Sequence, residues 1–94
     1  MTDVFILTKP PSNPRSNLCL GLMERSEAPR LYLAGDGVYH LLGGLNIRGG
    51  RVLASSEDMA ARGIPTREKT EVPGDFYADL VENIMERADR VYSF

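Results

Sequence analysis

Three features of this chain contain residue types that can do chemistry. The only cysteine, Cys19, lies in "NPRSNLCLGLM" (13–23), and the only histidine, His40, lies in the glycine-rich segment "GDGVYHLLGG" (35–44). A free thiol exchanges sulfur in its thiolate form, and a histidine can carry a proton near neutral pH. A glycine-rich turn can hold a phosphate. Each feature also has a purely structural interpretation.

Cys19 is predicted to lie on a helix over about 14–26. Asn13 is a good helix cap, and Pro14 suits the first helical position. Arg15 precedes the cysteine by four residues and therefore shares its helix face. A guanidinium placed there favours the thiolate form, so the pair Cys19 and Arg15 is a candidate nucleophile with its stabilising cation.

The alternative for Cys19 is a place in the hydrophobic core. Leu18, Leu22 and Met23 share one arc of the predicted helix with the cysteine. Free cysteine is among the most buried residue types, and spacing alone favours the core interpretation.

The glycine-rich segment follows the second predicted strand, whereas a dinucleotide-binding fingerprint follows the first. His40 also stands where that fingerprint has its third glycine. A structural turn with Asp36 as the cap of a short helix is therefore the preferred interpretation. His40 has no serine or cysteine beside it in sequence, which favours a packed or surface histidine over a proton carrier.

The chain alternates apolar runs with helical patterns, which predicts an α/β fold with a mainly parallel sheet. We expect a three-layer α/β/α sandwich of four or five strands with flavodoxin-like topology. Ser56 is the expected cap of the helix over 57–62, and Gly63 is expected to end it. The predicted strands are 3–9, 30–34, 51–55 and 90–94, with a short one near 70–72; the other predicted helices are 38–45 and 75–89.

The segments that follow the first three strands are expected to meet at one edge of the sheet. These segments are the loop 10–14 and the turns 35–37 and 55–56. In open α/β sheets ligands bind beyond the carboxyl ends of the strands, and Cys19 is expected one helical turn below that edge.

The bulk properties are those of an ordinary globular domain spanning 1–94. The net charge of -2 argues against nucleic-acid binding through bulk electrostatics, although Arg48 with Arg51, or Arg67 with Lys69, form local basic pairs. One cysteine excludes an intramolecular disulfide and a multi-cysteine zinc site. The chain shows no signal peptide and no long apolar run, so we expect a cytoplasmic protein.

The order of these elements resembles the DsrH/TusB family of small sulfur-relay proteins, within the DsrE/DsrF/DsrH-like group. The resemblance spans nearly the whole chain, and its most specific elements are the strand with Asp-Gly-Val-Tyr at 36–39 and the strand with "EDMAARGI" at 57–64. The segments that carry it are "VFILTKPP", "LCLGL", "LYLAGDGVY", "RVLASSEDMAARGI" and "DFYADLVENIMERADRVYSF".

The resemblance implies a DsrEFH-like fold and a cytoplasmic subunit that passes persulfide sulfur between proteins, rather than a stand-alone enzyme. Such relays serve tRNA wobble 2-thiouridine synthesis or sulfur oxidation. The implied partners are DsrE/TusD-like and DsrF/TusC-like subunits, or further copies of the chain, together with sulfur donor and acceptor proteins. Any contact with nucleic acid is indirect, and no membrane is involved. Cys19 matches a first-helix cysteine proposed to take part in DsrH-type chains. The persulfide exchange that the resemblance implies for such a thiol needs no cofactor and no metal, and we expect none.

The chain departs from its relatives at their principal carrier thiol, which follows the third strand. This sequence has Ser55 and Ser56 there. Three hypotheses follow, in order of preference. The first is a relay subunit with Cys19 as carrier and Arg15 as its stabiliser. The second is a structural subunit that positions a partner's cysteine. The third is a small-molecule or nucleotide-binding domain that uses the segment 35–50.

Overall fold

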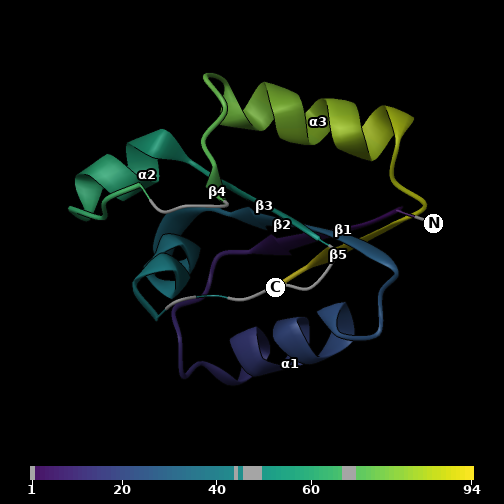
Figure 1. The fold of residues 1–94 in the computed structure, drawn as a ribbon, viewed down its shortest axis with the longest axis horizontal. Helices are drawn as coiled ribbons and strands as arrows, with labels where there is room; N and C mark the ends of the chain where they lie inside the picture. Colours follow the sequence, from purple (N-terminus) through teal and green to yellow (C-terminus); the bar gives the residue numbers. More distant parts are fainter. Residues whose placement is uncertain (1, 44, 46–49, 67–69) are drawn as a thin grey trace.

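Five parallel strands form one sheet in the order β4-β3-β2-β1-β5 (Figure 1). The protein is described here from a computed structural model, which covers residues 2–43, 45, 50–66 and 70–94. The strands are β1 (Thr2–Leu7), β2 (Ala28–Leu33), β3 (Arg51–Ala54), β4 (Thr70–Glu71) and β5 (Arg90–Ser93). The helices are α1 (Pro14–Met23), the 3-10 helix η1 (Gly35–Gly43), α2 (Ser56–Ala61) and α3 (Phe76–Glu86).

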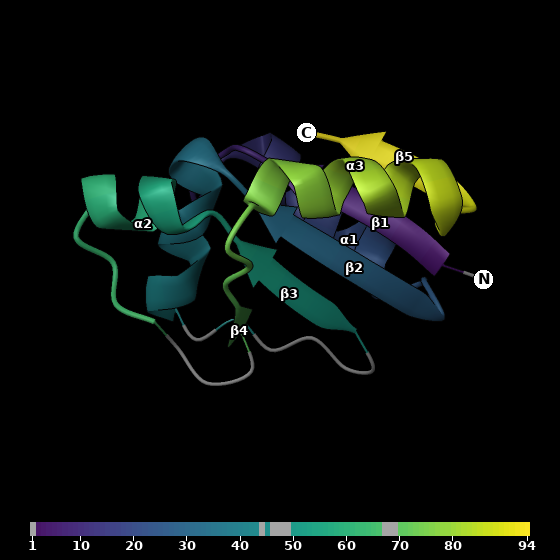
Figure 2. The same ribbon diagram turned by 90° about the horizontal axis from the view of Figure 1, so that it is seen from above.

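Helices α1 and α3 cover opposite faces of the sheet, which confirms the predicted three-layer α/β/α sandwich (Figures 1 and 2). The central strands β1 and β2 end in the apolar runs 4–7 and 31–33, as expected of strands that are covered on both faces. The strand order differs from the flavodoxin order 2-1-3-4-5. The likeness to flavodoxin therefore lies in the layers. The strands β1 to β4 follow one another across the sheet, and the chain then crosses from β4 at one edge to β5 at the opposite edge.

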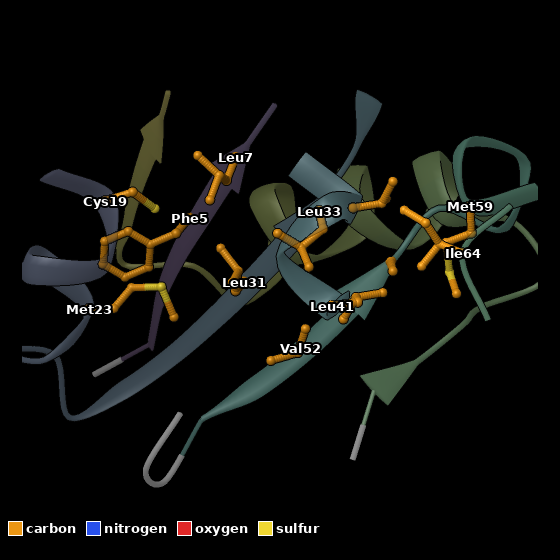
Figure 3. Packing of buried hydrophobic residues seen from close by; sticks show 12 residues of the cluster. Phe5, Leu7, Cys19, Met23, Leu31, Leu33, Leu41, Val52, Met59 and Ile64 are labelled. Carbon is orange, nitrogen blue, oxygen red and sulfur yellow. The ribbon is translucent and has the colours of Figure 1, made fainter. Parts of the chain in front are cut away.

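Two apolar cores separate these layers. The first core lies between the sheet, α1 and η1, and includes Cys19 (Figure 3). The second lies between the sheet and α3, and its largest members are Tyr32 and Phe76. Their rings pack edge to face, with centroids 5.6 Å apart. Strand residues alternate between the two cores, as the period of two in a strand requires.

Local side-chain caps explain where the helices begin. The Asn13 carboxamide oxygen accepts a hydrogen bond from the Arg15 amide at 2.9 Å, as the sequence predicted. Asp75 caps α3 in the same way by accepting from the Ala78 amide at 3.1 Å. Helix α1 ends at Met23, three residues before the expected end.

The prediction that Ser56 caps the next helix is wrong by one residue. Ser55 is the cap of α2, and its hydroxyl accepts from the Asp58 amide. Gly63 ends the helix as predicted, with φ of 65°. The amides of Gly63 and Ile64 donate back to the carbonyls of Ala60 and Met59, which is the Schellman arrangement.

The segment after β2 also begins earlier than expected. The 3-10 helix η1 starts at Gly35, so Asp36 lies in its first turn and is not the cap that was predicted. The rest of the glycine-rich segment, at 44 and 46–49, lies outside the described residues, as do Arg48, Arg67 and Lys69.

Candidate functional site

The loops after β1, β2 and β3 meet at the carboxyl edge of the sheet, as the topology predicted. The Gly35 amide, after β2, donates to Asp58 Oδ2 of α2 at 2.9 Å. His40 Nε2 lies 3.1 Å from the carbonyl oxygen of Lys9, which follows β1. Three chain segments that are distant in sequence therefore form one continuous edge.

Close backbone packing joins two of these segments. The Ala34 amide donates to the Leu7 carbonyl oxygen at 3.2 Å, and Gly37 lies directly against the same carbonyl. A Cβ atom at Gly37 would lie 2.0 Å from that oxygen. The glycine at this position is therefore required by the close approach of η1 to the end of β1.

A charged cluster holds α2 against η1 at this edge. Arg62 Nε lies 3.1 Å from Asp36 Oδ1, and its guanidinium lies 3.6 Å from Asp58 Oδ1. The same guanidinium lies over the ring of Tyr39, 5.9 Å from its centroid. These groups are partly exposed and satisfy one another, so the cluster joins two elements and leaves no reactive group unpaired.

His40 and Ser16 form a buried pair that the sequence did not predict. His40 Nε2 lies 3.2 Å from Ser16 Oγ, and the serine hydroxyl donates to the carbonyl oxygen of Pro10 at 2.8 Å. Because the Lys9 carbonyl can only accept, the histidine carries its proton on Nε2 in this arrangement.

The orientation of this pair is wrong for nucleophilic catalysis. A base that activates a serine must accept the hydroxyl proton, whereas His40 Nε2 is the donor here. Ser16 is also completely buried. The pair ties η1 to the start of α1, which agrees with the prediction of a packed histidine.

We predict that His40 makes folding stability depend on pH. Burial lowers the pKa of His40 below its ordinary value of 6.5, and the hydrogen bond to the Lys9 carbonyl offsets part of that effect. The unfolded chain therefore binds a proton at a higher pH than the folded chain does. The contribution of neutral His40 to the free energy of unfolding is therefore complete above pH 6.5. It is lost as the pH falls toward the folded-state pKa, by at most about 1.4 kcal/mol per pH unit.

The matched variant is His40→Gln, whose amide keeps a donor and does not titrate. Denaturant unfolding of both proteins between about pH 7 and pH 5 should show a larger loss of stability in the wild type. Parallel curves over that range would contradict the prediction, because His40 is the only histidine in the chain.

Cys19 lies in the first core, with no exposed surface (Figure 3). Its neighbours in that core include Phe5, Leu7 and Met23. Burial raises the pKa of the Cys19 thiol to about 12 and is the sole cause of that shift. In this conformation the thiol is a small apolar side chain, as the core interpretation predicted.

The structure shows no effect of Arg15 on the Cys19 thiol, since burial is the one cause of the shift in the pKa of Cys19. Its side chain is exposed, and its backbone amide is engaged by Asn13. No cation lowers the pKa of Cys19. The two residues are four positions apart on α1, but Cys19 is buried in the core and Arg15 is exposed to solvent.

A small hollow lies at the opposite, amino end of the sheet. It has a volume of about 200 Å³ and is lined by Asp3, Arg25, Ser26 and Arg90, among others. Asp3 is nearly buried, but Ser26 donates to its Oδ2 at 2.7 Å and Arg90 Nε lies 3.4 Å from its Oδ1. The hollow is smaller than typical ligand pockets, and its carboxylate is paired with Arg90, although the buried Oδ1 accepts no hydrogen bond from the described residues.

A polar network beneath α3 is equally self-contained. Asp79 accepts from the Tyr32 hydroxyl at 2.7 Å and from the Asn83 amide at 3.2 Å, and Asn83 accepts from Arg30. Its residues come from β2 and α3, whose adjacency the sequence did not specify. The network fixes α3 on the sheet.

The described part of the chain contains no other group that points to a cofactor. No three His, Cys, Asp or Glu side chains in it lie close enough to hold a metal ion. Arg51, part of a predicted basic pair, donates from Nε and Nη2 to the two carboxylate oxygens of Glu71 at 2.7 and 2.6 Å. None of the described helices is long and apolar enough to span a membrane.

Comparisons of the chain with protein-family models, with curated proteins and with solved structures gave no match.

Proposed function

We propose that this protein is a structural subunit of a cytoplasmic, DsrE/F/H-type sulfur relay, whose partner chains carry the persulfide. The relay serves tRNA wobble 2-thiouridine synthesis or sulfur oxidation. Support for the relay comes from the resemblance of the sequence to DsrH/TusB chains. Support for the structural role comes from one observation, the complete burial of the only thiol in the chain.

The chemistry of sulfur transfer explains why burial of the thiol favours the structural-subunit hypothesis over the carrier hypothesis. An acceptor thiolate attacks the outer sulfur of a donor persulfide, a new sulfur–sulfur bond forms, and the donor leaves as its own thiolate. The acceptor must therefore be ionised and accessible. Cys19 is neither, because its exposed fraction is 0% and its pKa is raised to about 12.

The position at which the relatives have their principal carrier provides no substitute. Ser55 is buried, and its hydroxyl caps α2. Ser56 is exposed at the first position of that helix, but a hydroxyl does not form a persulfide. A carrier cysteine must therefore come from another chain.

The direct test is intact-protein mass spectrometry after incubation with glutathione persulfide. We expect the native wild type to gain no sulfur during the time in which the denatured chain gains one atom at Cys19. A sulfur gained by the native wild type and absent from Cys19→Ser would show that Cys19 is a carrier and would overturn the structural role.

The relay itself is tested by reconstitution with a DsrE-type carrier chain and its persulfide donor. We expect sulfur transfer through the carrier to fall when this protein is omitted and to be restored equally by wild type and Cys19→Ala. Transfer that is unchanged by the omission would overturn membership in the relay.

A further inference from the structure

The outer face of α3 carries a row of exposed apolar side chains. Tyr77, Val81 and Met85 are 56%, 57% and 78% exposed. They follow one another at intervals of four residues and therefore form one ridge along the helix. They are three of the six large apolar side chains exposed in the described part of the chain. We call the surface formed by Tyr77, Val81 and Met85 the α3 ridge.

The α3 ridge is bordered by acidic residues on its solvent side. Asp75, Glu82 and Glu86 line the same shallow surface depression as the three apolar residues. From Asp75 to Glu86 the sequence contains no lysine or arginine, and the first cation is Arg87 at the end of the helix; of the four carboxylates in that segment, Asp79 is bonded to the sheet and the other three border the ridge. The protein as a whole has a net charge of only -2, so this helix carries a concentrated negative field.

This charge is not neutralised within the described residues. Glu82 and Glu86 have no ion-pair partner among them. The two carboxylates are four residues apart, a spacing at which like charges destabilise a helix slightly. A cation supplied from outside would remove that repulsion.

We propose that the α3 ridge binds an amphipathic helix of a partner protein, whose apolar stripe is bordered by lysine or arginine. An i±4 ridge fits the groove between ridges of a second helix. The backbone groups of a helix are bonded within the helix, so a strand has nothing to pair with on α3 itself. The acidic border selects a basic occupant by charge complementarity.

The same charges argue against a second copy packed through this helix. Two α3 helices in contact through this face would bring six carboxylates together, Asp75, Glu82 and Glu86 from each copy, without a lysine or arginine from either segment 75–86. Like charges placed across an interface oppose association. The sheet beneath adds to the apolar character of this side, because Val91 of β5 pairs in register with Val4 of the second core and is exposed. Figure 2 shows β5 at the edge of the sheet beside α3.

This inference deepens the proposed function, since a structural subunit requires a docking surface, but its test uses no sulfur chemistry. The probe is a synthetic amphipathic helix about five turns long, with a leucine stripe bordered by lysine. A second peptide has the same leucines and glutamate in place of every lysine. Binding of both peptides to the full chain is measured by fluorescence anisotropy.

We expect the lysine peptide to bind at least about tenfold more tightly than the glutamate peptide. Val81→Ser and Met85→Ser should each weaken its binding severalfold, because they remove central apolar contacts. The double variant Glu82→Gln, Glu86→Gln should weaken binding and reduce its dependence on salt. The matched control is Leu18→Ser on α1, which removes an equally exposed apolar side chain (56%) from the opposite layer.

Three outcomes would overturn the proposal. Equal binding of the two peptides would show that the acidic border does not select the partner. Binding that is weakened as much by Leu18→Ser as by Val81→Ser would place the contact elsewhere. A wild-type dimer in sedimentation equilibrium that Val81→Ser abolishes would make a second copy the occupant. Failure of the sulfur-transfer experiments would leave the peptide results unaffected, so the two proposals fail separately.

Discussion

Replacing Gly37 with alanine is expected to lower the free energy of unfolding by at least about 3 kcal/mol. The added Cβ would lie 2.0 Å from the Leu7 carbonyl oxygen and 2.9 Å from its carbon. Both atoms belong to the backbone at the end of β1, so no flexible side chain can move aside. The Leu7 oxygen also accepts the Ala34 amide, and a shift that relieved the clash would break that bond.

Gly21→Ala provides a matched control with the opposite sign. Gly21 is exposed within α1, and nothing lies within 4 Å of an added Cβ. Alanine should stabilise the protein there by about 0.5–1 kcal/mol, because it restricts the unfolded chain and favours the helix. Denaturant unfolding followed by circular dichroism measures both variants. A Gly37→Ala protein within 1 kcal/mol of wild type would contradict the close packing of η1 on β1.

The Cys19 thiol is expected to react with iodoacetamide at least about a thousandfold more slowly in the native protein than in the denatured chain. A rise in pKa from 9.0 to about 12 lowers the thiolate fraction near neutral pH by about three powers of ten. The thiol also has no exposed surface, so the reagent reaches it only when α1 opens.

The sharpest control places an exposed thiol on the same helix. In a Leu18→Cys, Cys19→Ser protein the new cysteine replaces a side chain that is 56% exposed. It should react at nearly the rate of a denatured thiol. Alkylation followed by intact mass spectrometry gives both rates. A native Cys19 rate within tenfold of the Leu18→Cys rate would contradict its burial and would support the carrier hypothesis.

The fold follows from local signals that agree with one another. Apolar runs separated by helical patterns predict parallel strands with covering helices, and the sheet has the expected strands at positions shifted by a few residues. Helix ends are predicted well, because capping is an interaction between close neighbours in sequence. The side chains of Asn13 and Asp75 begin two helices, and Gly63 ends a third with a positive φ. Ser55 and Ser56 show the limit of such signals. Either of two adjacent serines can cap a helix, and the residue that does so is the one whose backbone is still extended when the helix begins, here Ser55.

The chemistry of the candidate residues depends on contacts that no spacing reveals. The pattern around Cys19 placed it on an arc with leucines, which favoured the core, and also on a face with Arg15. Only the position of α1 on the sheet decides that its thiol lies in the core while Arg15 remains in solvent. His40 had no serine nearby in sequence, yet the meeting of η1 with the start of α1 brings Ser16 to 3.2 Å.

The sequence by itself determined the alternation of strands and helices, the parallel sheet, and which loops share its carboxyl edge. These properties arise from periodicity, capping and chain connectivity, which act over a few residues or follow from topology. The tertiary structure alone decided that the thiol is buried, that Gly37 touches Leu7, and that the α3 ridge is left uncovered. Burial and close approach depend on how the layers pack, and packing brings together residues that are far apart in sequence. Their spacing along the chain does not indicate that they are in contact.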